Sequence, residues 1–395
     1  MAEQIPAPCA SATAVAPPTV LRTREEAEVY VASVCFKHGP PKLLGAELEW
    51  VVQHSGNPHL PLKARQLADA LGTHAPTSLV PDSPQLPLPH GSTVTIEPGG
   101  QLEISSPPRA SLAELITTVE GDTATLTDLL DPAGLVLSGS GSDPHRPSRR
   151  LIDIPRYAAM EAAFDRIGPM GRTMMCSTAA VQVCLDAGAG ADITQRWAAL
   201  HDLGPVLLGA FANSPWLGGQ RTGWSSSRMH AWFALDPVRT RPGAVHDDPA
   251  ADWARRALDT PLLCRRRPGS SWSVPNGVTF VDWMSGQLPG EPTTEDLDYH
   301  LTTLFPPVRP HGHLEVRYLD TQPAGEWLVP VAVVAALLAQ PEITAAAREA
   351  AAPAAGRWLA AAKHGLRDPV LATAACTVFD LACRALATIG APEEL

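Results

Sequence analysis

Two glutamates separated by one residue, Glu47 and Glu49, are the first side chains whose type and spacing suggest chemistry. The pattern around them predicts a β-strand over 42–53. Because successive side chains of a strand point to opposite faces, both carboxylates lie on one face and the apolar residues beside them lie on the other. Taken alone, such a polar face is what a half-buried antiparallel strand normally turns toward water.

Two further predicted strands, 101–105 and 314–319, repeat this arrangement. The polar face of the first carries Glu103, and that of the second carries Glu315 and Arg317. Carboxylates on neighbouring strands repel one another unless cations compensate. Oxygen ligands of this kind suit Mg²⁺, which in turn binds the phosphates of a nucleotide. The three strands therefore predict, in outline, a site for phosphoryl transfer.

Other motifs carry less information. The sequence has no P-loop, and Gly139–Gly141 lacks the third glycine of a dinucleotide fingerprint, so we interpret it as a flexible loop, with a substrate-contacting loop as the alternative. His311 and His313 could share a strand face, but no third ligand lies near them, and we interpret them as a structural or solvated pair. Cys184 and Cys376 lie in apolar patterns and are predicted to be core thiols.

The composition narrows the class of protein. A chain of 395 residues can bury a large core, and its formal net charge of −11 disfavours nucleic acid as a partner. Seven cysteines without a CxxC pair predict neither a disulfide framework nor a structural zinc site, which fits a reducing cytoplasm. The longest apolar run, 327–339, is about half of a membrane span and reads as a buried helix. We expect small-molecule partners, no membrane contact, a cytoplasmic location and a monomer.

Strands and helices in irregular order must position the acidic residues. Strands are predicted at 42–53, 93–96, 101–105, 178–186 and 314–319, with a hairpin turn at 97–100, and helices at 62–74, 111–130, 155–167, 193–212 and from about 326 onward. This order predicts an α+β fold with an antiparallel sheet, rather than βαβ units. We expect a disordered segment at 1–22 and a single domain at 23–395, of which 326–395 is mainly helical.

Several motifs together resemble the glutamate–cysteine ligases of the plant and proteobacterial type. In the family's order they are Gly45-Ala-Glu-Leu-Glu-Trp50, Glu97-Pro-Gly-Gly-Gln-Leu-Glu-Ile-Ser105, Arg156-Tyr-Ala-Ala-Met160, Gly171-Arg-Thr-Met-Met175, the strand 178–186 and Leu314-Glu-Val-Arg317. The segment 138–150 is most similar to the actinobacterial branch, which makes γ-glutamylcysteine for ergothioneine synthesis. The resemblance covers roughly 43–327.

The resemblance implies a strongly curved antiparallel sheet, related to that of glutamine synthetase, whose concave side holds metal ions and the ATP phosphates. The magnesium ligands it implies are Glu47, Glu49, Glu103 and Glu315, with Glu97 as a further candidate on the hairpin. Arg317 would be catalytic, stabilising the transferring phosphoryl group, and would bind ATP together with Glu103. Thr178 and Gln182 would contact substrate in the glutamate pocket, and Arg228 would hold a substrate carboxylate.

The reaction that the resemblance implies is ATP- and Mg²⁺-dependent ligation of L-glutamate to L-cysteine. The γ-carboxylate attacks the γ-phosphorus of ATP to give γ-glutamyl phosphate, and the cysteine amine then displaces phosphate. Two alternatives stay open. One is a ligase that joins glutamate to another amine, because no residue is assigned to thiol recognition. The other is a catalytically silent nucleotide- or metal-binding regulator, which the retention of the acids and Arg317 disfavours.

Overall fold

The computed structural model describes residues 18–395, except 244, 387–388, 390 and 392–395. Most of the segment predicted to be disordered, up to residue 17, lies outside the described residues. The first helix begins directly after Thr23, whose side chain accepts a hydrogen bond from the backbone N–H of Glu26 while Glu26 reaches back to the Thr23 backbone. This reciprocal cap satisfies two backbone donors that a helix start otherwise leaves free.

Helices and strands follow one another irregularly along the chain. The strands are β1 (Leu44–His54), β2 (Thr93–Ile96), β3 (Leu102–Ser105), β4 (Leu135–Ser138), β5 (Ala180–Leu185), β6 (Trp216–Leu217), β7 (Gln220–Arg221), β8 (Val308–Pro310) and β9 (Leu314–Asp320). The α-helices are α1 (Arg24–Cys35), α2 (Ala64–Leu71), α3 (Leu112–Leu130), α4 (Pro155–Asp165), α5 (Met170–Ser177), α6 (Ala191–Asp202), α7 (Gly204–Ala210), α8 (Ser227–Leu235), α9 (Pro237–Thr240), α10 (Pro249–Asp259), α11 (Phe280–Met284), α12 (Thr294–Leu301), α13 (Leu328–Leu337), α14 (Pro341–Ala351), α15 (Trp358–His364) and α16 (Pro369–Leu386).

The main sheet has seven strands. Six of them follow the order β2-β3-β1-β5-β9-β8, and the seventh, β4, pairs with the C-terminal residues 51–54 of β1. Every pairing between these strands is antiparallel. The predicted α+β class, with helices flanking an antiparallel sheet, is confirmed, and each predicted strand is present. β1 is central because it pairs with β3 and β5 on its two edges, and it therefore brings the predicted acidic strands together.

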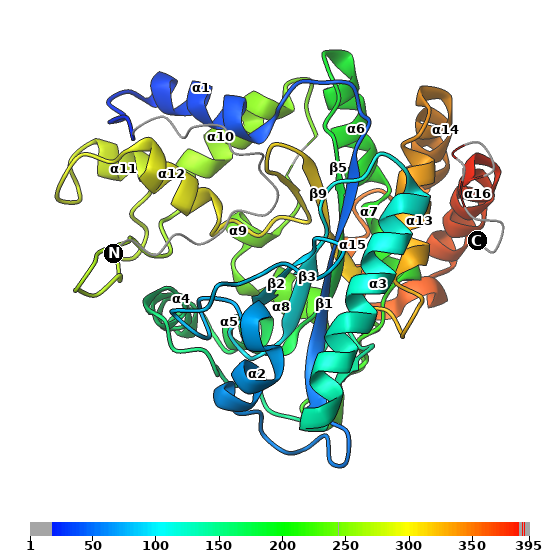
Figure 1. Cartoon of the computed structure of the whole chain (residues 1–395). Coiled ribbons are helices and arrows are strands. Elements are labelled where there is room, and N and C mark those ends of the chain that lie inside the picture. Colours follow the sequence, from blue (N-terminus) through cyan, green and yellow to red (C-terminus); the bar gives the residue numbers. More distant parts are fainter. Residues whose placement is uncertain (1–17, 244, 387–388, 390, 392–395) are drawn as a thin grey trace.

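One face of the sheet is apolar and forms part of the core. Leu48 and Trp50 of β1 and Leu102 and Ile104 of β3 are buried there. Helix α3 packs against β1, and α13 packs against β5. In Figure 1 both helices run along the right side of the strands, while α4, α5 and the group α10–α12 lie to the left. The polar residues between the apolar ones therefore lie on the face turned away from α3 and α13.

The single helix predicted over 193–212 is instead two helices, α6 and α7, separated at Leu203. Pro205 lies in the first turn of α7, where a residue without a backbone N–H is tolerated but cannot continue α6. Gly204 allows the close approach of α15, since a Cβ there would lie 1.9 Å from the Trp358 ring. The break therefore lies at Gly204-Pro205, two local residues that the apolar periodicity did not take into account, and the Trp358 contact fits there because residue 204 has no side chain.

By length and composition alone, helix α16 could span a membrane. Helices α13 and α14 would reach that length only if they were joined, and a bend of 108° separates them. Helix α16 packs on α7, α13 and α14 and buries Leu371, Val378 and Ala382 against them. The prediction for Cys376 was wrong: it is exposed, because the helical phase places it away from this apolar stripe. Cys184 is half-buried and lies on the polar side of β5 rather than in the core.

Candidate active site

The strand register aligns the predicted acidic residues on one face of the sheet. Glu49 of β1 lies opposite Glu103 of β3, and Glu47 lies opposite Gln182 of β5. Glu315 of β9 lies opposite Cys184 of β5, two residues after Gln182 on the same face of that strand. Residues opposite one another in an antiparallel pair point to the same face. We call this surface, defined by Glu47, Glu49, Glu103 and Glu315, the acidic face.

Four glutamates of this region resist ionisation. Burial and then repulsion by Glu103 raise the pKa of Glu47 and of Glu49 well above the usual value. The same two causes raise the pKa of Glu97, in the β2–β3 turn, to about 7. Burial also raises the pKa of Glu103, although a 2.7 Å hydrogen bond from Thr95 opposes the shift. Glu103 thus repels three other carboxylates and is the electrostatic centre of the group.

Glu315 has different surroundings from the other acids. Arg309 donates two hydrogen bonds to its carboxylate, of 2.6 and 3.0 Å, and Arg317 also donates to it. Burial alone would raise the pKa of Glu315, but attraction by Arg309 and Arg317 outweighs it and lowers the pKa to about 2. A carboxylate offers about four lone-pair sites. These two arginines therefore leave Glu315 able to accept a further ligand.

The donor set fits a divalent cation in its chemistry. Several carboxylates with raised pKa values share one face, and a bound cation would relieve their mutual repulsion. Across the part of the chain that the structure describes, no three His, Cys, Asp or Glu side chains already form a group that could hold a metal ion. Metal binding would require these side chains to draw together.

The raised pKa of Glu97 predicts a pH-dependent stability for the metal-free protein. Between the ordinary value of 4.5 and about 7, the folded state keeps a proton that the unfolded state loses. The free energy of unfolding therefore falls as the pH rises through this window. Glu97→Gln removes that loss, so the variant should unfold a few degrees above wild type at about pH 8, with little difference at about pH 4.5.

Thermal unfolding in chelator at both pH values measures this difference. Glu120, exposed on α3 and outside the acidic face, supplies the matched control, and Glu120→Gln should leave the unfolding temperature close to that of wild type. An equal shift for Glu97→Gln at both pH values would contradict the prediction.

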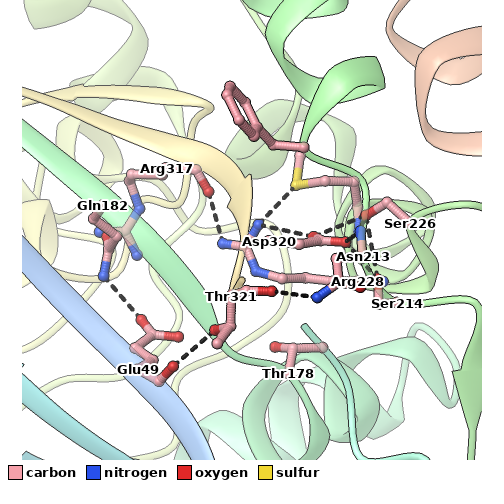
Figure 2. Close-up of polar contacts among 12 residues, drawn as sticks. Glu49, Thr178, Gln182, Asn213, Ser214, Ser226, Arg228, Arg317, Asp320 and Thr321 are labelled. Carbon is pink, nitrogen blue, oxygen red and sulfur yellow. Dashed lines mark hydrogen bonds and ion pairs between the residues drawn. The ribbon is translucent and has the colours of Figure 1, made fainter. Parts of the chain in front are cut away.

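A second cluster lies at the end of the acidic face, around Arg228 and Gln182 (Figure 2). Gln182 donates a 2.8 Å hydrogen bond to Glu49. Arg228 donates a 2.6 Å hydrogen bond to the backbone carbonyl of Arg317, and the guanidinium groups of both arginines lie over the Trp232 ring, at 4.9 and 5.5 Å. The structure thus brings the predicted substrate residues Gln182 and Arg228 close to Arg317.

Three buried polar atoms in this cluster have no hydrogen-bond partner among the described residues: Gln182 Oε1, Arg228 Nε and Arg317 Nε. Such atoms are costly unless a water or a ligand satisfies them, and they mark this end of the sheet as a binding site for a polar molecule. Thr178 differs, because its hydroxyl donates to the backbone carbonyl of Met174 at 2.7 Å and so closes the end of α5.

The structure also identifies residues that the sequence patterns missed. Arg309 holds Glu315 from the neighbouring strand, and the register of the β8–β9 hairpin places the two opposite each other. A hairpin interpretation of the His311–His313 turn would have found this pair. Asp320, fully buried at the end of β9, forms an ion pair with Arg228, its Oδ1 lying 3.8 Å from Nη1. Simple alternation from Glu315 and Arg317 would put Asp320 on the apolar face, and only the register shift that pairs it with Ala180 turns it to the face of Gln182.

The weaker motifs have structural roles. The loop Gly139–Gly141 is tightly packed, since a Cβ on Gly141 would lie 2.7 Å from the side chain of Asp320. His311 and His313 form the β8–β9 turn, where the His311 N–H donates to the His313 carbonyl at 2.8 Å. Burial lowers the pKa of His311 to about 4.

A cavity of about 630 Å³ lies elsewhere, between α8 and α15, and its walls include His201, Phe233 and Trp358. None of the predicted site residues lines it. Its volume would suit a small ligand, but the shifted carboxylates and unpaired arginine nitrogens favour the acidic face as the binding site.

Comparison with known proteins gives consistent matches over most of the chain. Residues 43–391 match the model of glutamate-cysteine ligase family 2. The glutamate–cysteine ligase EgtA of Mycolicibacterium smegmatis is 40% identical over 395 residues, covering 98% of this chain and 89% of that protein. A chloroplastic glutamate–cysteine ligase of Brassica juncea is 32% identical over 318 residues, covering 76% of this chain and 61% of that protein.

Among solved structures, a glutamate–cysteine ligase of Francisella tularensis, crystallised in complex with AMP, is similar with a TM-score of 0.50. The match covers 91% of this chain and 80% of that one at 15% sequence identity. At this identity the likeness concerns the fold, and it agrees with the antiparallel sheet and its flanking helices.

Proposed function

Because the chain belongs to glutamate-cysteine ligase family 2, we propose that it joins the γ-carboxylate of L-glutamate to the amine of L-cysteine, with cleavage of ATP. The observation that carries this function is the 40% identity with EgtA over nearly the whole of both chains. The resemblance to the actinobacterial branch supports a role for its product, γ-glutamylcysteine, in ergothioneine synthesis. The protein is an enzyme of the ATP-dependent ligase class.

Phosphoryl transfer to a carboxylate requires positioning and charge neutralisation more than a protein nucleophile. The glutamates that would hold Mg²⁺ are Glu47, Glu49, Glu97, Glu103 and Glu315. The bound metal would neutralise and orient the ATP phosphates. Arg317 extends from the same face and stabilises the charge on the phosphoryl group as the γ-carboxylate of glutamate attacks it. Its ion pair with Glu315 fixes the guanidinium before substrate arrives. No serine or cysteine nucleophile is needed.

Gln182 and Arg228 are proposed to bind glutamate. The unpaired Gln182 Oε1 can accept from the glutamate amino group, and the unpaired Arg228 Nε can donate to a carboxylate oxygen. Thr178 is proposed to shape the pocket by fixing the turn between α5 and β5, since its hydroxyl is already bonded to Met174. The partners are glutamate, cysteine and ATP, and we propose a cytoplasmic monomer.

A phosphate-release assay with different amines tests the function and separates it from its alternatives. Wild-type protein is supplied with ATP, Mg²⁺ and glutamate, alone or with cysteine, serine, alanine or glycine. Phosphate release that depends on cysteine, with a product at the mass of γ-glutamylcysteine, is expected. Faster release with another amine would identify a different glutamate ligase, and no release with any amine would favour a silent regulator.

Replacement of Arg228 by alanine should mainly raise the glutamate KM, by about tenfold or more, because a charged hydrogen bond to a substrate carboxylate is lost. Steady-state kinetics with glutamate as the varied substrate measures this. Arg239 supplies the matched control: it is equally buried, pairs with Asp236 at 3.3 Å and lies outside the acidic face. Arg239→Ala should lower stability without changing the glutamate KM. An unchanged glutamate titration in Arg228→Ala would remove Arg228 from the pocket.

A further inference from the structure

The carboxylate of Asp320 lies next to Arg228 and has no role in the proposed reaction. It is fully buried at the end of β9. Its Oδ2 accepts hydrogen bonds from the Ser214 hydroxyl at 2.6 Å and from the Asn213 backbone N–H at 2.8 Å. Its Oδ1 accepts from the Ser226 hydroxyl at 2.9 Å and lies 3.8 Å from Arg228 Nη1. Figure 2 shows these groups gathered around the carboxylate.

These partners connect Asp320 to the start of helix α8. Ser226 is the N-cap of that helix, and its hydroxyl accepts from the Met229 backbone N–H at 3.1 Å. The Ser214 hydroxyl accepts from the Arg228 backbone N–H at 3.2 Å. Both hydroxyls are oriented by donating to Asp320, so the carboxylate fixes the first turn of α8 and, through it, the backbone of Arg228.

The side chain of Arg228 links the start of α8 to Arg317. Its Nη2 donates to the backbone carbonyl of Arg317, and its guanidinium lies over the Trp232 ring beside that of Arg317. A buried guanidinium without a counter-charge is strongly disfavoured. Asp320 is the carboxylate that the structure places against Arg228. Burial lowers the pKa of Arg228, and the negative charge of Asp320 opposes that shift.

We propose that Asp320 is a positioning residue of the ligase reaction, which holds Arg228 charged and oriented to bind the carboxylate of glutamate. This inference rests on the proposed function, since it requires that Arg228 binds glutamate. Asp320 itself touches no substrate, and its effect on glutamate binding passes through Arg228.

The test is a double-mutant cycle read out as the glutamate KM. Asp320→Asn keeps the shape of the side chain but removes its charge, and it should raise the glutamate KM about tenfold, comparable to the loss of a group that orients a binding side chain. The ATP KM should change much less. In the Arg228→Ala background, Asp320→Asn should raise the glutamate KM no further. An unchanged KM in the single variant, or full multiplication of the two effects, would overturn the proposal.

Asp122 supplies a matched control for simple loosening of the fold. It is also fully buried and accepts backbone hydrogen bonds, from His90 at 2.8 Å and from Ser92 at 2.9 Å, but it lies on α3 away from Arg228. Asp122→Asn should lower stability and leave the glutamate KM unchanged. An equal rise in KM in Asp122→Asn would show a general effect of instability and would overturn the proposal.

If Asp320→Asn does not fold, Ser214→Ala takes its place, because it removes one donor from the carboxylate and keeps the charge. A smaller rise in the glutamate KM supports the proposal, and an unchanged KM contradicts it. The wild-type protein separates this inference from the function on which it rests. Without cysteine-dependent phosphate release from wild type, both fail. With normal release and a wild-type KM in the variants, only the role of Asp320 fails.

Discussion

Arg317→Ala should lower kcat by about a thousandfold, the lower end of the effect of an arginine that neutralises a transferring phosphoryl group. The guanidinium lies on the acidic face, where it forms an ion pair with Glu315 and lies over the Trp232 ring. Folding should suffer much less, because Glu315 keeps its two hydrogen bonds from Arg309. Steady-state phosphate release and thermal unfolding, measured on the same preparation, separate the two effects.

Arg196 is a suitable comparison for this variant. It is 9% exposed against 8% for Arg317, and it donates hydrogen bonds to the backbone carbonyls of Asp186 and Leu338 rather than to a residue of the acidic face. Arg196→Ala should cost stability but retain most of the turnover of the folded enzyme. If Arg317→Ala loses no more activity than Arg196→Ala, Arg317 has no catalytic role.

Glu103→Gln should lower turnover by about two to three orders of magnitude and raise the Mg²⁺ concentration needed for half-maximal activity. Glu103 repels Glu47, Glu49 and Glu97, so it contributes most to the attraction of the acidic face for a cation. Removing its charge relieves that repulsion in the metal-free protein. We therefore expect the variant to unfold at the same temperature as wild type or at a higher one, while it loses activity.

A magnesium titration of phosphate release, with thermal unfolding in chelator, measures both parts of this prediction. Glu161→Gln is the matched control: Glu161 is likewise half-buried, but it forms ion pairs with Arg150 and Arg172. Its replacement should lower the unfolding temperature and leave the magnesium requirement unchanged. A normal magnesium requirement in Glu103→Gln would exclude Glu103 as a metal ligand.

The parts of the site that the sequence predicted are those set by local geometry. Alternation along a strand is nearly invariant, so Glu47 and Glu49 could be placed on one face without knowledge of any partner strand. The pairing of Glu49 with Glu103 is a matter of register between strands, and the sequence could only suggest it through the repeated pattern. The family resemblance supplied the reaction, which periodicity could not.

The parts that were missed depend on tertiary contacts. Simple alternation along β9 predicts Asp320 on the apolar face, but a register shift between β5 and β9 pairs it with Ala180, on the face of Gln182. Its charge is stable there only because Ser214, Ser226 and Arg228 arrive from a distant segment. The approach of Trp358 to Gly204 likewise depends on the fold, although Pro205 in the local sequence already marks the break between α6 and α7. The sequence around Asp320 gives no sign of its partners from the segment 214–228, and the sequence around Gly204 gives no sign of Trp358.

The most direct test of the proposed reaction is isotope transfer from glutamate to phosphate. If the γ-carboxylate attacks the γ-phosphorus of ATP, the bridging oxygen of γ-glutamyl phosphate leaves with phosphorus when the cysteine amine displaces it. Wild-type enzyme supplied with ATP, Mg²⁺, cysteine and glutamate labelled with oxygen-18 in its γ-carboxylate should release phosphate that carries one labelled oxygen per γ-glutamylcysteine formed. Unlabelled phosphate, released in equal amount to the product, would contradict the account.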